Sequence, residues 1–243
     1  MERLSRWLAA VGSIALLGFV IGAMPASARP SPAPEADVQP VAGMAPDARS
    51  MTVQVLASCP ERWTVVQAVV TVSQPGAFGE SSFPLTCIDS LRSFWITVPA
   101  ASGTFQLVDA QVSASVVVKR GKTAQANDSD VARVQPLVDV ALAGTARLES
   151  GGGAVTIDVT VACPAGTSGV ESRLVVSQGQ AIGVGLYTPV CDGTPHTFTV
   201  RVETSESAYQ AGFVAQALTF ANIDHAGQIF YGIDSDGSVE LVS

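Results

Sequence analysis

Apolar residues recur at every second position over several short segments of this chain. The alternation covers the matched segments 53–59 and 157–163, 66–72 and 170–176, 94–98 and 198–202, and 110–116 and 214–220. A period of two is typical of a β-strand with one buried face. Gly, Pro and Ser punctuate the segments, and no helix-length 3.6-residue pattern follows the first 28 residues. The pattern therefore predicts an all-β protein.

The same segments recur at a fixed shift of 104 residues. "CPERWTVVQAVVTVSQ" begins at Cys59, "CPAGTSGVESRLVVSQ" begins at Cys163, and no gap is needed from Thr52/Thr156 to about Val118/Asn222. Such self-similarity indicates a duplicated domain. The inward row Ala110, Val112, Ala114 and Val116 is expected to repeat as Val214, Gln216, Leu218 and Phe220. Each copy is expected to close with a hairpin at an Asp-rich turn, 127–130 and 234–237. We predict two tandem immunoglobulin-like β-sandwiches.

The first 50 residues carry different patterns. Arg3 and Arg6 precede the apolar run 8–23 and the small-residue site Ala26-Ser27-Ala28, which predicts a signal peptide over 1–28. An uncleaved N-terminal anchor is the alternative. Residues 29–50 are rich in Pro and Ala and are expected to be a disordered leader. The sandwiches are then expected over 51–142 and 143–243.

The charge balance narrows the class of partner. Removal of Glu2, Arg3 and Arg6, a net of one positive charge, would take the formal charge from −8 to −9. Lys119 and Lys122 are the only lysines, so the clustered cations that nucleic acid requires are missing. After signal removal nothing in the sequence predicts membrane attachment. We expect a secreted protein that interacts with neither nucleic acid nor membrane.

The four cysteines favour disulfides over a metal site. Cys87 follows Cys59 by 28 residues, and Cys191 follows Cys163 by the same distance. An even number of cysteines in an exported chain indicates a disulfide framework, and the repeated spacing favours Cys59–Cys87 and Cys163–Cys191 over a crossed pairing. Metal binding would require closely spaced ligands with histidine nearby, and the first repeat has no histidine. We expect no cofactor.

The residues with chemical potential carry weak signals. His196 lies in "CDGTPHTF" and aligns with Arg92, so the two copies share no chemistry there, and a turn or edge histidine is favoured over a ligand or base. No serine lies in a Gly-x-Ser-x-Gly elbow. Asp234 and Asp236 could contribute to a weak calcium site, although Asp-Gly is also a favoured hairpin turn. We expect a protein that is not an enzyme.

One difference between the copies suggests a contact surface. The predicted outward row of the strand after Cys59 includes Trp63, Val65 and Val69, and Trp95 is outward on a later strand. In the second repeat the matching row is Thr167, Gly169, Glu171 and Arg173, and the residue that corresponds to Trp95 is Thr199. An exposed apolar patch indicates a contact. Three interpretations remain open: packing against the second repeat or the leader, binding of an external partner, and apolar residues that are merely scattered over the surface.

The second repeat resembles a family of short secreted actinobacterial proteins of unknown function. The resemblance rests on Val155–Cys163, Val175–Gln178, Cys191-Asp192-Gly193 and His196-Thr197-Phe198. The first repeat keeps Ser73-Gln74 and both cysteines but departs from the pattern at Ile88-Asp89 and Arg92. The resemblance implies an immunoglobulin-like domain and carries no assigned reaction.

These observations favour a secreted, non-enzymatic tandem sandwich protein of unknown specific role. We expect it to bind an extracellular or cell-envelope protein or glycan, because sandwiches present loops on a rigid frame. A secreted protease inhibitor, with an exposed loop at 76–83 or 179–186, is one alternative. A purely structural envelope component is the other.

Overall fold

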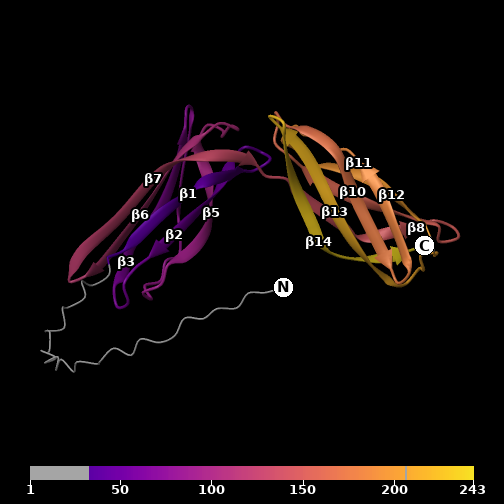
Figure 1. Cartoon of the computed structure of the whole chain (residues 1–243), viewed down its shortest axis with the longest axis horizontal. Coiled ribbons are helices and arrows are strands. Elements are labelled where there is room, and N and C mark those ends of the chain that lie inside the picture. Colours follow the sequence, from indigo (N-terminus) through magenta and orange to yellow (C-terminus); the bar gives the residue numbers. More distant parts are fainter. Residues whose placement is uncertain (1–32, 206) are drawn as a thin grey trace, which may run out of the picture. The chain divides into compact units, whose positions relative to one another are not determined.

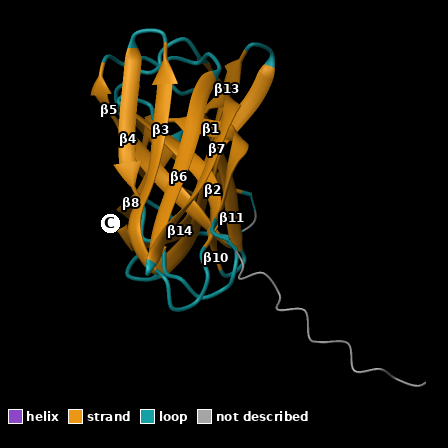
Figure 2. Ribbon diagram, turned by 90° about the vertical axis from the view of Figure 1, so that its left-hand side faces the viewer, coloured by secondary structure: helices purple, strands orange, loops and turns teal. Residues whose placement is uncertain are grey.

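The computed structural model describes residues 33–205 and 207–243, which form fourteen strands and no helix (Figures 1 and 2). Within this part of the chain there is consequently no helix with the length and apolarity that a membrane crossing requires. The expected signal peptide lies outside the described residues. The all-β prediction is confirmed.

The first sandwich contains β1 to β7. Their bounds are β1 Glu35–Met44, β2 Ser50–Ser58, β3 Thr64–Gln74, β4 Ala77–Ser82, β5 Arg92–Ser102, β6 Ala110–Arg120 and β7 Lys122–Pro136. The order β1-β2-β5-β4-β3-β6-β7 closes on itself, because β7 pairs with β6 along one part and with β1 in parallel along another. Side chains from both layers fill a core that includes Met51, Val70, Val98 and Phe105.

The second sandwich has the same order. Its strands are β8 Asp139–Leu148, β9 Ala154–Ala162, β10 Ser168–Gln178, β11 Ala181–Tyr187, β12 His196–Thr204, β13 Val214–His225 and β14 Gln228–Val242. They follow the order β8-β9-β12-β11-β10-β13-β14, with β14 parallel to β8. Ile157, Leu174 and Leu241 are among the fully buried side chains. The two-sandwich architecture is therefore present.

The prediction of a disordered leader over 29–50 is wrong for Glu35–Met44. These residues form β1, and Val38, Ala42 and Met44 are buried in the first core. Pro40 lies where the pairing with β2 shifts register between Val38 and Ala42. A bulge is one of the few places where a strand accepts proline, so the high proline content concealed a strand. The boundary at 142/143 also moves, because β8 already begins at Asp139.

The Asp-rich segments are not hairpin turns, as the sequence had suggested. They lie inside β7 and β14, and the hairpins fall at Gly121 and at Ala226-Gly227. Asp128 Oδ2 accepts a hydrogen bond from the Val38 N–H at 2.7 Å, and Asp234 Oδ2 accepts one from the Leu142 N–H at 2.9 Å. Each carboxylate joins a late strand of its sandwich to the first strand, beside the bulge in that first strand.

The repeated Val-Ser-Gln segments hold a loop in each sandwich. The Gln74 side chain donates to the Gln106 and Val108 carbonyls and accepts from the Gln106 N–H. Gln178 makes the corresponding pair of bonds with Gln210. Both sandwiches therefore have a glutamine at this position because its side chain holds the loop that precedes β6 or β13.

The fixed shift of 104 residues fails after these loops. Ala110 begins the buried row of β6, whereas the buried row of β13 is Ala215, Ala217, Thr219, Ala221 and Ile223, which corresponds to a shift of 105. The second chain segment thus has one extra residue before β13. A displacement of one residue moves every side chain to the other face of a strand. The expected inward positions of Val214, Gln216, Leu218 and Phe220 are therefore wrong, and these four residues face outward.

Candidate functional site

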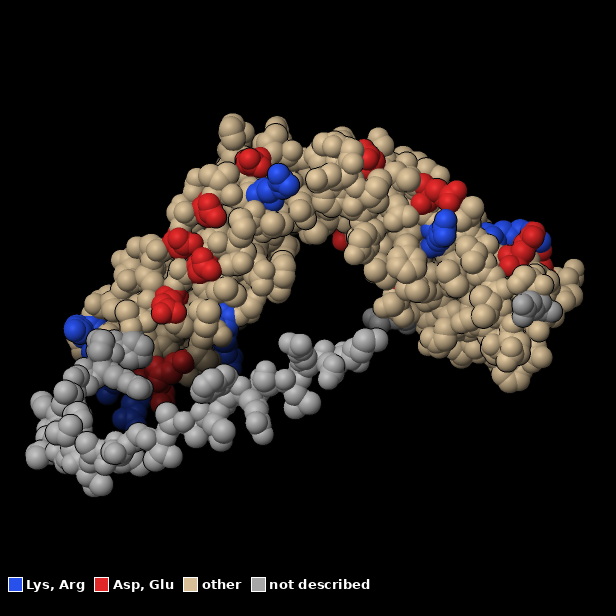
Figure 3. All heavy atoms as spheres, in the orientation of Figure 1, with Lys and Arg blue, Asp and Glu red and all other residues tan. Residues whose placement is uncertain are grey.

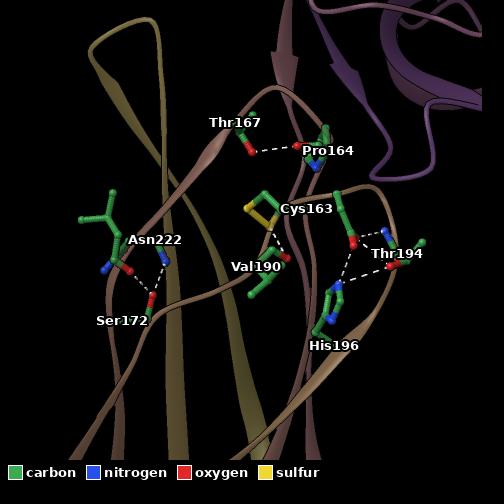
Figure 4. Close-up of a disulfide and its surroundings, with 11 residues drawn as sticks. Cys163, Pro164, Thr167, Ser172, Val190, Thr194, His196 and Asn222 are labelled. Atoms are coloured by element: carbon green, nitrogen blue, oxygen red, sulfur yellow. Dashed lines mark hydrogen bonds and ion pairs between the residues drawn. A yellow bond between two sulfur atoms is a disulfide. The ribbon is translucent and has the colours of Figure 1, made fainter.

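The four cysteines form two disulfides with the expected pairing. Cys59 is bonded to Cys87 and Cys163 to Cys191. Cys163 is buried, and the Val190 carbonyl lies 3.5 Å from its sulfur (Figure 4). Among the described residues, no three His, Cys, Asp or Glu side chains come together as metal ligands. Each disulfide connects a core position to a loop: Cys59 is bonded to the loop before β5, and Cys163 to the loop before β12.

His196 lies in a small polar cluster beside the second disulfide (Figure 4). Its Nε2 is 2.9 Å from Asp192 Oδ2 and 3.3 Å from Thr194 Oγ1. Hydrogen bonds from the Thr194 hydroxyl, from His196 and from the Thr194 N–H lower the pKa of Asp192 to about 2. The Thr194 hydroxyl donates to Asp192 at 2.7 Å, so the contacts stabilise a turn. His196 itself is the first residue of β12 and pairs with Val161, so its side chain supports the turn that precedes the strand.

The predicted outward row on β3 is only partly outward. The pairing of β3 with β6 shifts register between Val65 and Gln67, and this bulge reverses the alternation on its N-terminal side. Trp63 and Val65 therefore pack against the first core, and Val66 is exposed instead. Val69 lies beyond the bulge and is outward and half-buried. A contact role for these residues stays a prediction, but Trp63 and Val65 do not offer a free apolar face.

Trp95 does lie on an outer face, and its side chain is 70% exposed. It projects from β5 directly opposite Gln54 of β2. The Gln54 amide group donates to Ser93 Oγ at 2.8 Å, which fixes the amide beside the indole. The neighbouring row places Thr52 of β2 opposite Gly43 of β1, and Gly43 opposite Gln135 of β7. Four strands thus contribute to one surface around Trp95.

This surface is hollowed into a groove of about 460 Å³, here called the Trp95 groove. Its lining residues are Gln39, Pro40, Val41, Gly43, Thr52, Gln54, Trp95, Gln135, Pro136 and Leu137. Gly43 has no side chain, which leaves room for the Leu137 side chain to pack directly over it. A Cβ at position 43 would lie 2.7 Å from Leu137 Cδ2.

The lining has a distinctive chemical character. Its polar side chains are three glutamines and one threonine, all uncharged. The apolar part consists of Trp95, two prolines, Val41 and Leu137. A site with apolar walls and a few uncharged donors and acceptors suits a neutral, hydroxyl-rich ligand.

The second sandwich has different chemistry at the same place. Its register places Thr199 opposite Asp158, and Arg147 opposite Thr156. Arg147 therefore corresponds to Gly43, Asp158 to Gln54 and Thr199 to Trp95. Thr199 Oγ1 donates to Asp158 Oδ1 at 2.7 Å. The second sandwich has the same strand order but carries charged residues at the positions of the Trp95 surface. The fold itself therefore does not require an exposed tryptophan.

Sequence reasoning identified Trp95 but missed its partners in the groove. Gln54 and Gln135 lie far from Trp95 along the chain and reach it only through strand pairing. Pro40 and Gly43 were assigned to a disordered leader. A comparison of Gln54 with Asp158 at the shift of 104 would have revealed a second difference between the copies on the same face.

Comparisons with known proteins add no family to this description. Neither the protein-family models nor the curated proteins compared with the sequence match the chain.

Proposed function

We propose that this protein is a secreted, non-enzymatic binding protein whose first sandwich holds a neutral glycan in the Trp95 groove. The observation that carries the proposal is the exposed indole of Trp95 among uncharged hydrogen-bonding side chains. A tryptophan seldom remains this exposed on a surface that has no partner, because its ring carries a large apolar area.

The chemistry of a sugar ring suits this arrangement. One face of a pyranose presents C–H groups that can lie flat on the indole. Each sugar hydroxyl both donates and accepts a hydrogen bond. The side chains of Gln39, Gln54 and Gln135 each offer an NH2 group as donor and a carbonyl oxygen as acceptor. An ionised ligand would find no opposite charge among the lining residues. A neutral polysaccharide of the cell envelope or the surroundings is therefore the favoured ligand class.

The exposed indole can contribute a measurable share of the binding free energy. Covering the exposed part of the indole removes on the order of 100 Å² of apolar surface from water, worth about 2.5 kcal/mol before association costs. Loss of the ring should therefore weaken binding by roughly 10- to 100-fold, since about 1.4 kcal/mol corresponds to a factor of ten.

The remaining parts of the proposal follow from the same scaffold. Two disulfides are compatible with an oxidising compartment. We further propose that each sandwich is an immunoglobulin-like variant, supported by its antiparallel layers and its single disulfide. A protease inhibitor is less favoured, because residues 76–83 and 179–186 belong largely to β4 and β11. We also propose that the chain is related to the secreted actinobacterial proteins that its second repeat resembles.

A retention assay tests the glycan proposal. The purified protein is incubated with insoluble neutral polysaccharides and with acidic polysaccharides, and the bound fraction is measured. We expect retention on a neutral polymer, and its loss in Trp95→Ala. Phe213→Ala, which removes a 60% exposed aromatic ring from the second sandwich, is the matched control and should bind normally. Equal retention of both variants, or retention on none of the neutral polymers, would exclude the Trp95 groove as a glycan site.

A further inference from the structure

The outer face of the second sandwich carries a large apolar surface on the sheet β11-β10-β13-β14. Its exposed members lie on the two outer strands of this sheet, in rows of three: Ile182, Val184 and Leu186 on β11, and Ile229, Tyr231 and Ile233 on β14. We call this surface the β11–β14 face. Each side chain alternates with an inward neighbour, so the rows belong to one side of the sheet.

The strands between the two rows complete the surface. Val175 of β10 lies opposite Val184 on one side and Leu218 of β13 on the other. Phe220 of β13 lies opposite Ile233. All three of the inner residues, Val175, Leu218 and Phe220, are half-buried and outward. The apolar side chains therefore form a continuous band across four strands.

The equivalent sheet of the first sandwich is polar. On β4 the outward row is Phe78, Glu80 and Ser82, in the place of Ile182, Val184 and Leu186. The outward rows of β6 and β7 include Ser113, Ser115, Gln125, Asn127 and Ser129, several of which hydrogen-bond to one another. The same strand order thus folds with a solvated face, so the apolar band is a property of the second sandwich alone.

The β11–β14 face carries few charges: Arg173 and Glu171 lie within it, Asp224 lies opposite Ile229, and Glu203 of β12 borders it opposite Val184. Arg173 lies between Leu186 and Phe220, and its guanidinium is 3.6 Å from the Glu171 carboxylate. In Figure 3, acidic side chains follow one another along the visible side of the first sandwich (left), whereas in the second sandwich (right) several visible acidic side chains lie beside basic ones. A second copy related by a two-fold axis would bring an identical Arg173–Glu171 pair, so charges of both signs would meet within the apolar band.

We propose that the β11–β14 face binds the same face of a second copy of this chain. The six exposed side chains present on the order of 600 Å² of apolar surface, at the upper limit for a typical monomer. With Val175, Leu218 and Phe220 the face reaches about 800 Å², which is what each partner buries in a standard interface. Two twisted sheets pack face to face with interdigitated side chains, and a self-complementary contact of this kind closes as a two-fold dimer.

Sedimentation velocity of the purified, disulfide-bonded protein over a concentration series tests the proposal. The wild type should form a dimer that dissociates on dilution. Val184→Lys should raise the dimer dissociation constant at least tenfold, because the dimer would have to bury an ammonium group at 51% exposed Val184, even though Glu203 of β12 lies opposite it. Val131→Lys makes the same change at a 55% exposed position of β7 in the first sandwich and should leave the dimer intact.

Tyr231→Lys provides a second test at the opposite side of the face, and it decides the matter alone if thermal melting shows that Val184→Lys is unfolded. A wild type that stays monomeric at about 100 µM overturns the proposal, as does a dimer that neither variant weakens. Trp95→Ala should sediment as the wild type does, so the dimer and the glycan site succeed or fail separately.

Discussion

The carboxylate of Asp128 should contribute substantially to the stability of the first sandwich. It accepts the Val38 N–H at 2.7 Å in a partly buried setting, 90 residues away along the chain. Val38 itself is only 3% exposed, so water cannot easily replace the acceptor. Asp128→Ala removes the acceptor and leaves the backbone donor of β1 without a partner beside the bulge.

The expected magnitude follows from the type of bond. A hydrogen bond to a charged group contributes about 1.5 to 3 kcal/mol, and leaving its buried partner unsatisfied costs the desolvation of that partner. We expect Asp128→Ala to lower the free energy of unfolding by about 2 kcal/mol, equivalent to roughly 10 °C in Tm for a domain of about 100 residues. Asp128→Asn keeps an acceptor oxygen but loses the charge and should cost about half as much.

In the mature chain, tryptophan fluorescence reports this unfolding selectively, because Trp63 and Trp95 lie in the first sandwich, the second sandwich has no tryptophan, and Trp7 belongs to the expected signal peptide. Asp130→Ala is the matched control, since Asp130 is exposed and its side chain accepts only from the adjacent Val131 N–H. A Tm for Asp128→Ala within 2 °C of the Asp130→Ala value would refute the reasoning. A loss of stability that appears only when calcium is present would do the same, because it would assign the carboxylate to an ion.

Two further predictions concern the polar cluster and the groove. The pKa of Asp192 should be about 2 by NMR titration, and Thr194→Val should raise it toward the ordinary 3.8 by removing the strongest of its hydrogen bonds. Because folding lowers this pKa, its stabilisation is complete above pH 4 and lost as the pH falls toward 2; an unchanged pKa in Thr194→Val would contradict the assignment. Gly43→Arg should abolish glycan retention while the protein stays folded, because the new side chain must displace Leu137, which packs over Gly43, lines the groove and is itself 37% exposed. Normal retention by this variant would place the ligand elsewhere.

Sequence pattern predicted the strands that carry alternating apolar residues, namely β2, β3, β5, β6 and their counterparts β9, β10, β12 and β13, as well as both disulfides, because alternation and cysteine spacing are local signals. It failed wherever one residue was inserted into a regular alternation. The bulge between Val65 and Gln67 turned Val65 toward the core, and the extra residue before β13 turned Leu218 and Phe220 outward. Neither event changes composition, yet each exchanges the inner and outer faces of a strand.

The candidate site was predictable only in part, for a related reason. An exposed tryptophan on an alternating strand could be inferred at Trp95. The groove depends on the register of four strands and on β1, whose Pro40 made it resemble a linker. Cross-strand neighbours such as Gln54 and Gln135 become visible only when the pairing is known.

The most direct test of the glycan proposal is an NMR titration of the protein with the neutral polysaccharide that it retains, or with a soluble oligosaccharide of that polymer. We predict saturable shifts of the Trp95 indole N–H and of the Gln54 and Gln135 side-chain amides, with little change in the second sandwich. A ligand that binds while these three groups keep their resonance positions would contradict the assignment of the Trp95 groove as the binding site.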